Sequence, residues 1–152
     1  MLRRCLLVLV GLAAGGAAVE LALLRHWHGP LQLVPWFALA AVGVGAGVLA
    51  GRPSPWAVQA VRGLALAVAL CAAGGVAAHV AANYDAGPLD QRYTTTWDTL
   101  PLATRWWAAL TLTVGPAPPI APGVLAQAAL GLLFATVRHP ALDPARRRAA
   151  DA

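Results

Sequence analysis

The sequence predicts an all-α fold: an integral membrane four-helix bundle with a long outer loop that contains an interfacial or re-entrant helix. Of the 152 residues, 59% are hydrophobic and 11% are charged, which is far from the composition of a soluble domain. Four mainly apolar segments reach the roughly 17 to 25 residues that a helix needs to cross the hydrocarbon. The basic residues, all eleven of them arginine, stand mainly at the ends of these segments, where membrane topology is encoded.

The two N-terminal spans are predicted over residues 5–24 and 31–50. Pro35 and Trp36 mark the start of the second span, and the sequence GRPSPW ends it because proline cannot continue a helix. Residues 1–18 also have the basic start, apolar middle and small residues of a cleavable signal peptide. We favour a retained span because the apolar run continues to Leu24, and cleavage is the alternative.

The third and fourth spans are predicted over residues 57–82 and 120–137, with an outer loop, 83–119, between them. That loop is too long for an ordinary connection. Its segment 102–115 is apolar for only about a dozen residues, below spanning length, so we expect an interfacial or a re-entrant helix there. The loop also carries tryptophans that suit the headgroup zone, namely Trp97, Trp106 and Trp107. Residues 1–152 therefore form a single transmembrane domain.

The arginines predict that both termini are cytoplasmic, because short cytoplasmic loops collect basic residues. In that orientation eight arginines face the cytoplasm, namely Arg3, Arg4, Arg52, Arg62, Arg138, Arg146, Arg147 and Arg148. Three face outward, namely Arg25, Arg92 and Arg105. The tail 138–152 is then cytoplasmic and the long loop faces the outside or periplasm. We expect a multi-pass protein of the inner or plasma membrane.

Small residues predict how the spans pack, because close backbone approach drives helix association in lipid. Gly11 and Gly15 in the first span, and Gly43 and Gly47 in the second, recur at a spacing of four. We expect these rows to pack within the bundle rather than to form a dimer face. The two cysteines fall at different depths in their spans, so we expect two free thiols and no disulfide.

A polar cluster is predicted at the outer face. Glu20 lies about one turn inside the outer end of the first span, and His79 lies at the same depth in the third. Ionisable groups at that depth are costly and are functional candidates by default. The adjoining loops bring further polar residues to this face. The candidate set is Glu20, His26, His28, His79, Tyr84 and Asp85.

Three interpretations of this cluster stay open. In the first, Glu20, His26, His28 and His79, helped by Asp85, ligate a transition metal, although two histidines two apart reach one ion only from an irregular loop. In the second, His79 and a loop histidine hold a haem. In the third, Glu20 pairs with Arg25 or accepts a hydrogen bond from His79 or Tyr84, which only fixes the helices in register. The fourth histidine, His139, is expected to be solvated beside Arg138.

The sequence favours a noncatalytic role over an enzyme. It has no Gly-x-Ser-x-Gly, Cys-x-x-Cys, phosphate loop or His-Glu-x-x-His, and Ser54 is its one serine. We expect an accessory, assembly or binding subunit with an outward-facing polar cluster and no resident cofactor. The alternative is a metal- or haem-linked redox or transport component. The expected partners are the lipid bilayer and other membrane subunits, and not nucleic acid, because the arginines form no stripe on a soluble surface.

Overall fold

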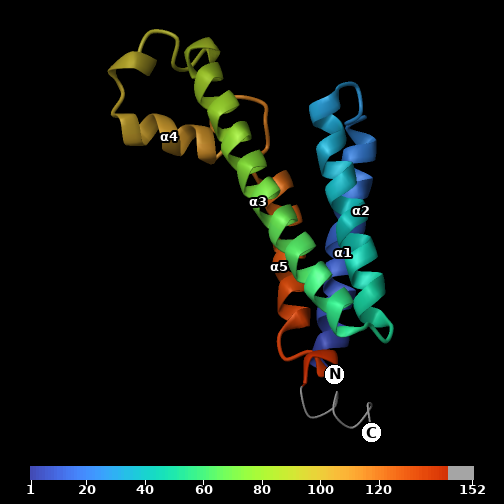
Figure 1. Cartoon of the computed structure of the whole chain (residues 1–152). Helices are drawn as coiled ribbons and strands as arrows, with labels where there is room; N and C mark the ends of the chain where they lie inside the picture. The colour runs from blue at the N-terminus through green and yellow to red at the C-terminus, as the bar shows by residue number, and fades with distance from the viewer. Residues whose placement is uncertain (144–152) are drawn as a thin grey trace, which may run out of the picture. The chain divides into compact units, whose positions relative to one another are not determined.

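The computed structural model describes residues 1–143, and that part of the chain is all-helical without a strand. The α-helices are α1 (Leu2–Leu23), α2 (Pro30–Ala50), α3 (Pro55–Ala86), α4 (Leu102–Leu110) and α5 (Ile120–Thr136) (Figure 1). Three short 3-10 helices complete the fold, namely η1 (Gly87–Leu89), η2 (Trp97–Thr99) and η3 (Pro140–Leu142). The all-α prediction is thus confirmed for these residues. Of the arginines predicted to be cytoplasmic, Arg146, Arg147 and Arg148 lie outside the described residues.

Three of the helices, α1, α2 and α3, are long and apolar enough to cross a membrane, which indicates a membrane protein. All three helices begin one to three residues before the predicted spans, and α3 also ends four residues later, because the chain outside the apolar runs also folds as helix; α1 ends one residue earlier and α2 ends as predicted. Helix α5 is shorter, with 17 residues. At 1.5 Å per residue it is about 26 Å long, slightly less than the hydrocarbon thickness of about 30 Å. The fourth span therefore stays a prediction.

Proline and serine set the helix starts. Pro30 occupies the first turn of α2, where a missing N–H costs nothing. Pro35 lies inside α2 and does not mark its beginning, so that detail of the prediction was wrong. At α3, the Ser54 hydroxyl accepts a hydrogen bond from the backbone N–H of Ala57 at 3.2 Å. Ser54 therefore caps this helix, with Pro55 as its first residue.

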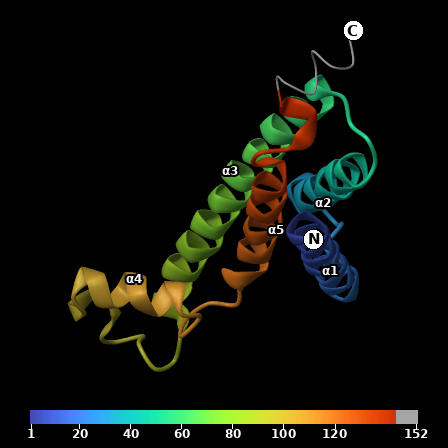
Figure 2. The same cartoon turned by 90° about the horizontal axis from the view of Figure 1, so that it is seen from below.

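The chain divides into two compact units. The helix unit comprises Met1–Ala72 and the chain from Val124 onward, and the loop unit comprises Ala73–Gly123. Helix α3 contributes to both units. The described part of the helix unit contains α1, α2, the first half of α3 and most of α5 (Figure 2).

Aliphatic and alanine side chains from all four of its helices fill the core of the helix unit. Two buried clusters form it, one around Val10, Val42 and Ala129 and the other around Val61 and Leu132. Cys5 and Cys71 are both free, as predicted. In lipid such a core is stabilised by close packing rather than by removal of apolar surface from water.

The glycines that allow this packing are not those predicted. A Cβ atom added at Gly45 would lie 2.7 Å from a methyl carbon of Leu132, so α2 and α5 approach closely there. An added Cβ at Gly43 or Gly47, by contrast, would meet nothing within 4 Å among the described residues, and the same holds for the Gly11 and Gly15 row. The predicted rows are therefore not packing faces in this part of the chain. In so alanine-rich a sequence, helix rotation rather than glycine spacing decides which residue meets a neighbour.

His139 is buried, which contradicts the prediction that it is solvated. Its side chain is 7% exposed, and its Nδ1 accepts a hydrogen bond from the backbone N–H of Ala141 at 3.2 Å. Burial is the first cause that lowers the pKa of His139, and the positive charges of Arg3 and Arg62 add to it. The ring is therefore neutral near pH 7.

The loop unit is organised around the C-terminal part of α3. Helix α4 buries Ala108 and Ala109 in a cluster that also contains Trp97 and Val114. Its other side exposes large apolar side chains, with Leu102 58% and Trp107 66% exposed. That exposure is compatible with a place in the membrane interface, and the interfacial or re-entrant position of α4 stays a prediction.

Candidate functional site

The predicted cluster draws on both units. Glu20, His26 and His28 belong to the helix unit, whereas His79, Tyr84 and Asp85 belong to the loop unit. We therefore describe the two halves of the cluster separately.

In the helix unit, the turn between α1 and α2 is fixed by its backbone. The chain leaves α1 through Arg25, whose φ of 50° lies in the left-handed region. The indole N–H of Trp36 donates to the carbonyl oxygen of His26 at 2.8 Å, and the His28 N–H donates to Oε1 of Gln32 at 2.8 Å. The Trp27 ring stacks on the His28 ring. The turn is thereby held in one shape that leaves the His28 side chain exposed.

Glu20 is exposed on the last turns of α1, and the ion pair with Arg25, one option in the third interpretation, does not form in the part of the chain that the structure describes. Other acidic residues do pair with arginine, because Asp90 contacts Arg92 and Asp98 contacts Arg105. Arg25 is itself exposed, so solvent or a lipid headgroup can satisfy both charges without a direct contact.

In the loop unit, His79 is tied to the chain that leads into α5. Its Nδ1 lies 2.8 Å from the carbonyl oxygen of Pro118. Because a carbonyl oxygen only accepts, Nδ1 carries the proton and the lone pair of the neutral ring lies on Nε2. That arrangement is typical of histidines whose second nitrogen serves a ligand or a proton.

Asn83 is the most buried polar residue of this unit, with no exposed surface. Its Nδ2 donates to the carbonyl oxygens of Ala109 at 3.0 Å and Ala117 at 2.7 Å. Its Oδ1 accepts from the backbone N–H of Ala117 at 2.9 Å. The amide thus joins α3 to the end of α4 and to the chain that follows. Gly115, with φ of 74°, passes so close that a Cβ there would lie 2.4 Å from Oδ1 of Asn83.

Tyr84 belongs to an aromatic cluster. Its ring stacks on that of Trp106 with centroids 4.5 Å apart and meets the edge of Trp97 at 5.6 Å. The guanidinium of Arg105 lies over the same tyrosine ring at 5.7 Å. Cation–π and edge-to-face contacts of this kind stabilise the packing beyond burial alone. Asp85, the next residue of α3, points out of this cluster and is exposed.

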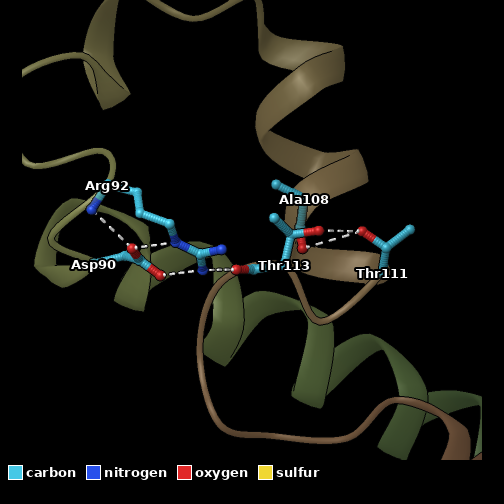
Figure 3. Close-up of polar contacts among 5 residues, drawn as sticks. All are labelled: Asp90, Arg92, Ala108, Thr111 and Thr113. Atoms are coloured by element: carbon cyan, nitrogen blue, oxygen red, sulfur yellow. Dashed lines mark hydrogen bonds and ion pairs between the residues drawn. The ribbon is translucent and has the colours of Figure 1, made fainter.

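Arg92 links two loops of this unit (Figure 3). Its Nε and Nη2 donate to both carboxylate oxygens of Asp90, and Nη2 also donates to the carbonyl oxygen of Thr113. The side-chain hydrogen bond from Arg92 is the main cause that lowers the pKa of Asp90 to about 2. The same carboxylate raises the pKa of Arg92.

Two features of the loop unit were missed from the sequence. Asn83 was not recognised as a residue that connects the elements of this unit, and the Asp90–Arg92 pair was not predicted. The only available signal for Asn83 was a lone amide at the end of an apolar run. The signal for the pair was two opposite charges two residues apart, a spacing that an irregular loop allows.

No group of three or more His, Cys, Asp or Glu side chains with metal-binding geometry occurs among residues 1–143. No protein-family profile, curated protein sequence or solved structure matches the chain.

Proposed function

We propose that the protein is a noncatalytic multi-pass membrane subunit whose loop unit is a preorganised platform for another membrane subunit at the outer face. The observation that carries the proposal is the use of Asn83 and His79. Their polar atoms bind the chain's own backbone, at Ala109, Ala117 and Pro118, and so fix an irregular segment in one shape. A platform needs that rigidity, because a preordered surface binds without the entropic cost of ordering it.

The arginine distribution supports an outer location for the platform, with both termini in the cytoplasm. In this orientation the exposed apolar side of α4 lies in the outer headgroup zone. Leu102, Trp106 and Trp107 then contact lipid, since tryptophan favours that depth. The polar surface remains for a protein partner. It includes the exposed residues Gln91, Thr94, Thr95 and Asp98, together with Asp85.

Photo-crosslinking in intact cells tests this division of the loop unit. A benzoylphenylalanine at Thr95 samples the polar surface, and one at Trp107 samples the apolar side of α4. Phe37, which is 71% exposed on α2, provides an aromatic control position on a spanning helix. We expect a discrete protein adduct from position 95 and lipid adducts alone from positions 107 and 37.

The outcome that contradicts the platform is the absence of a discrete adduct at position 95, or the same adduct from all three positions. Asn83→Asp in the position 95 variant provides a second check. It removes the two hydrogen bonds that Asn83 donates to Ala109 and Ala117 and does not alter α1 or α2, so the adduct should disappear while membrane insertion is retained.

A metal- or haem-linked role is the second candidate, and His79 is the observation that favours it. With Nδ1 bonded to Pro118, the free Nε2 lone pair has the orientation of a ligating imidazole. Metal analysis and a visible spectrum of the purified protein test this role. A bound metal or a haem band that is lost in His79→Gln would replace the platform proposal for this part of the loop unit.

A further inference from the structure

Two arginines from different helices meet at the C-terminal end of α5 in the helix unit. Arg3 of α1 donates from Nε to the carbonyl oxygen of Ala135 at 2.9 Å and from Nη2 to that of Arg138 at 3.3 Å. Arg62 of α3 donates from Nε to the hydroxyl of Thr136 and from Nη2 to its carbonyl oxygen, both at 2.9 Å. We call Arg3, Arg62 and the α5 end that they bind the arginine cap.

The arginine cap carries more positive charge than its partners neutralise. The acceptors are carbonyl and hydroxyl oxygens, and a helix C-terminus is equivalent to about half a negative charge. Two whole positive charges face it. Of the five N–H donors of a guanidinium, Arg3 uses two and Arg62 uses three, the third to Gln59. Both side chains are partly exposed, so the remaining donors can reach a ligand.

His139 lies beside the cap and is buried. Burial is the main cause that lowers the pKa of His139, and the positive charges of Arg3 and Arg62 lower it further. The ring is neutral and accepts at Nδ1, which leaves a proton on Nε2. The surroundings of the α5 end therefore offer hydrogen-bond donors and positive potential, which are the requirements for an anion.

The neighbours of the cap indicate what kind of anion. Leu2 precedes Arg3 and is 75% exposed, and Val137 follows Thr136 and is 56% exposed. An anion with an apolar chain satisfies both the guanidiniums and these side chains, whereas a soluble anion leaves the apolar surface uncovered. Basic sites between helices at the membrane surface are suited to phospholipid headgroups.

We propose that the arginine cap binds the phosphate of an anionic phospholipid, with the acyl chains along the exposed apolar side chains beside it. Arg3 and Arg62 are already held in place by the α5 end, so they bind the phosphate without losing much side-chain freedom. The planar guanidinium also matches two phosphate oxygens at once. The lipid thereby joins α1, α3 and α5 at one end of the helix unit.

The test uses the full chain in detergent, titrated with phosphatidylglycerol or phosphatidylcholine, with bound lipid read by native mass spectrometry and stability by thermal unfolding. We expect about one retained phosphatidylglycerol per chain and a higher melting temperature with that lipid than with phosphatidylcholine. Arg62→Gln should weaken phosphatidylglycerol binding about tenfold, the loss of one charge-assisted contact. Arg52→Gln is the matched control, because Arg52 is exposed on the 51–54 turn, and its effect should stay below about twofold.

Arg62→Lys covers the case in which the glutamine variant fails to fold. It keeps the charge and one donor for Thr136 but loses the planar fork, so an affinity loss of about threefold is expected. Equal losses in the Arg52 and Arg62 variants would show diffuse attraction and overturn the site. Inorganic phosphate forms the last arm. If it raises the melting temperature as much as the lipid does, with the same dependence on Arg62, the ligand is a soluble phosphate and the lipid assignment is wrong.

Discussion

The helix unit packs through alanine and aliphatic side chains, whereas the loop unit packs through aromatic rings and one buried amide. Gly45 and Leu132 illustrate the first, with a backbone approach that leaves no room for a methyl group. Asn83 and Tyr84 illustrate the second. The difference follows from how each unit satisfies the hydrogen-bonding groups of its backbone. A long helix satisfies its own N–H and C=O groups, so its neighbours need only fit, and small residues fit best.

The backbone of the loop unit, by contrast, cannot satisfy all of its own hydrogen-bonding groups. The chain from Thr111 to Pro119 is irregular, and its polar groups need partners from elsewhere in the fold. The Asn83 amide provides two of these hydrogen bonds, both to Ala117, and a further one to Ala109 of α4, while His79 bonds to Pro118. One substitution can therefore remove much of what holds the loop unit, whereas the two buried clusters of the helix unit consist of apolar side chains.

Asn83→Asp should have the largest effect and should be confined to the loop unit. The carboxylate has the same shape but cannot donate to Ala109 and Ala117, so two hydrogen bonds are lost. A carboxylate oxygen then faces the two carbonyl oxygens, and all three atoms are acceptors. We expect about 2–4 kcal/mol of lost stability for this unit. Hydrogen exchange measures it locally, since the backbone N–H groups of Thr113 and Val114, which donate to Ala108 beside Ala109, should lose protection. Amides of α1 should exchange as in the wild type.

Gln91→Glu is the control for the change from amide to acid, because Gln91 is exposed in the same unit. Its exchange pattern should match the wild type. If protection falls equally in α1 and α2 of Asn83→Asp, the two units unfold together and the distinction between them fails.

Gly45→Ala should have the next largest effect, this time in the helix unit. The added methyl group would lie 2.7 Å from a side-chain carbon of the buried Leu132, so the leucine must shift. Overpacking of this kind costs about 1–3 kcal/mol, less the helix propensity gained by alanine. Gly43→Ala is the matched control, since its methyl group would meet nothing within 4 Å among the described residues. Thermal unfolding in detergent should show a lower melting temperature for position 45 only.

The positions of the first three helices could be predicted, because the apolar run itself sets where a spanning helix lies. Which face of a helix packs could not be predicted. Gly43 and Gly45 are two residues apart and look alike in the sequence, yet only Gly45 meets a neighbour. The helix rotation that distinguishes them is set by side chains of α3 and α5, which no spacing within α2 reveals.

The partners of the candidate residues could not be predicted from the sequence. His79 and Tyr84 both lie in the C-terminal part of α3, and their partners lie about 20 to 40 residues further along the chain. Those partners depend on the path of residues 111–119, where Gly115 adopts a positive φ that its neighbours do not reveal. His139 was misjudged for the same reason, because Arg3 and Arg62 reach the α5 end from helices distant in sequence.

Acidification should have the smallest effect of the changes considered, and it should lower the stability of the helix unit at a higher pH than that of the loop unit. Burial and the charges of Arg3 and Arg62 hold the pKa of His139 in the helix unit below the ordinary value of 6.5. The unfolded chain then binds the proton more readily, so this contribution to stability is complete above about pH 6.5 and is lost as the pH falls through the folded pKa. Asp90 in the loop unit behaves differently. Its pKa of about 2 lies below the ordinary 3.8, so its contribution is retained until the pH falls below about 4.

Between about pH 7 and pH 5, therefore, only the helix unit should lose stability through these two groups. Hydrogen exchange corrected for the intrinsic pH dependence measures each unit in the same sample. His139→Asn keeps an acceptor for the Ala141 N–H but cannot be protonated in this range, so it should flatten the pH dependence of the helix unit. Asp90→Asn should leave the profile of the loop unit unchanged over the same range, because the carboxylate is already ionised throughout it. A loss of stability that persists in His139→Asn would assign the acid sensitivity of the helix unit to a group other than His139.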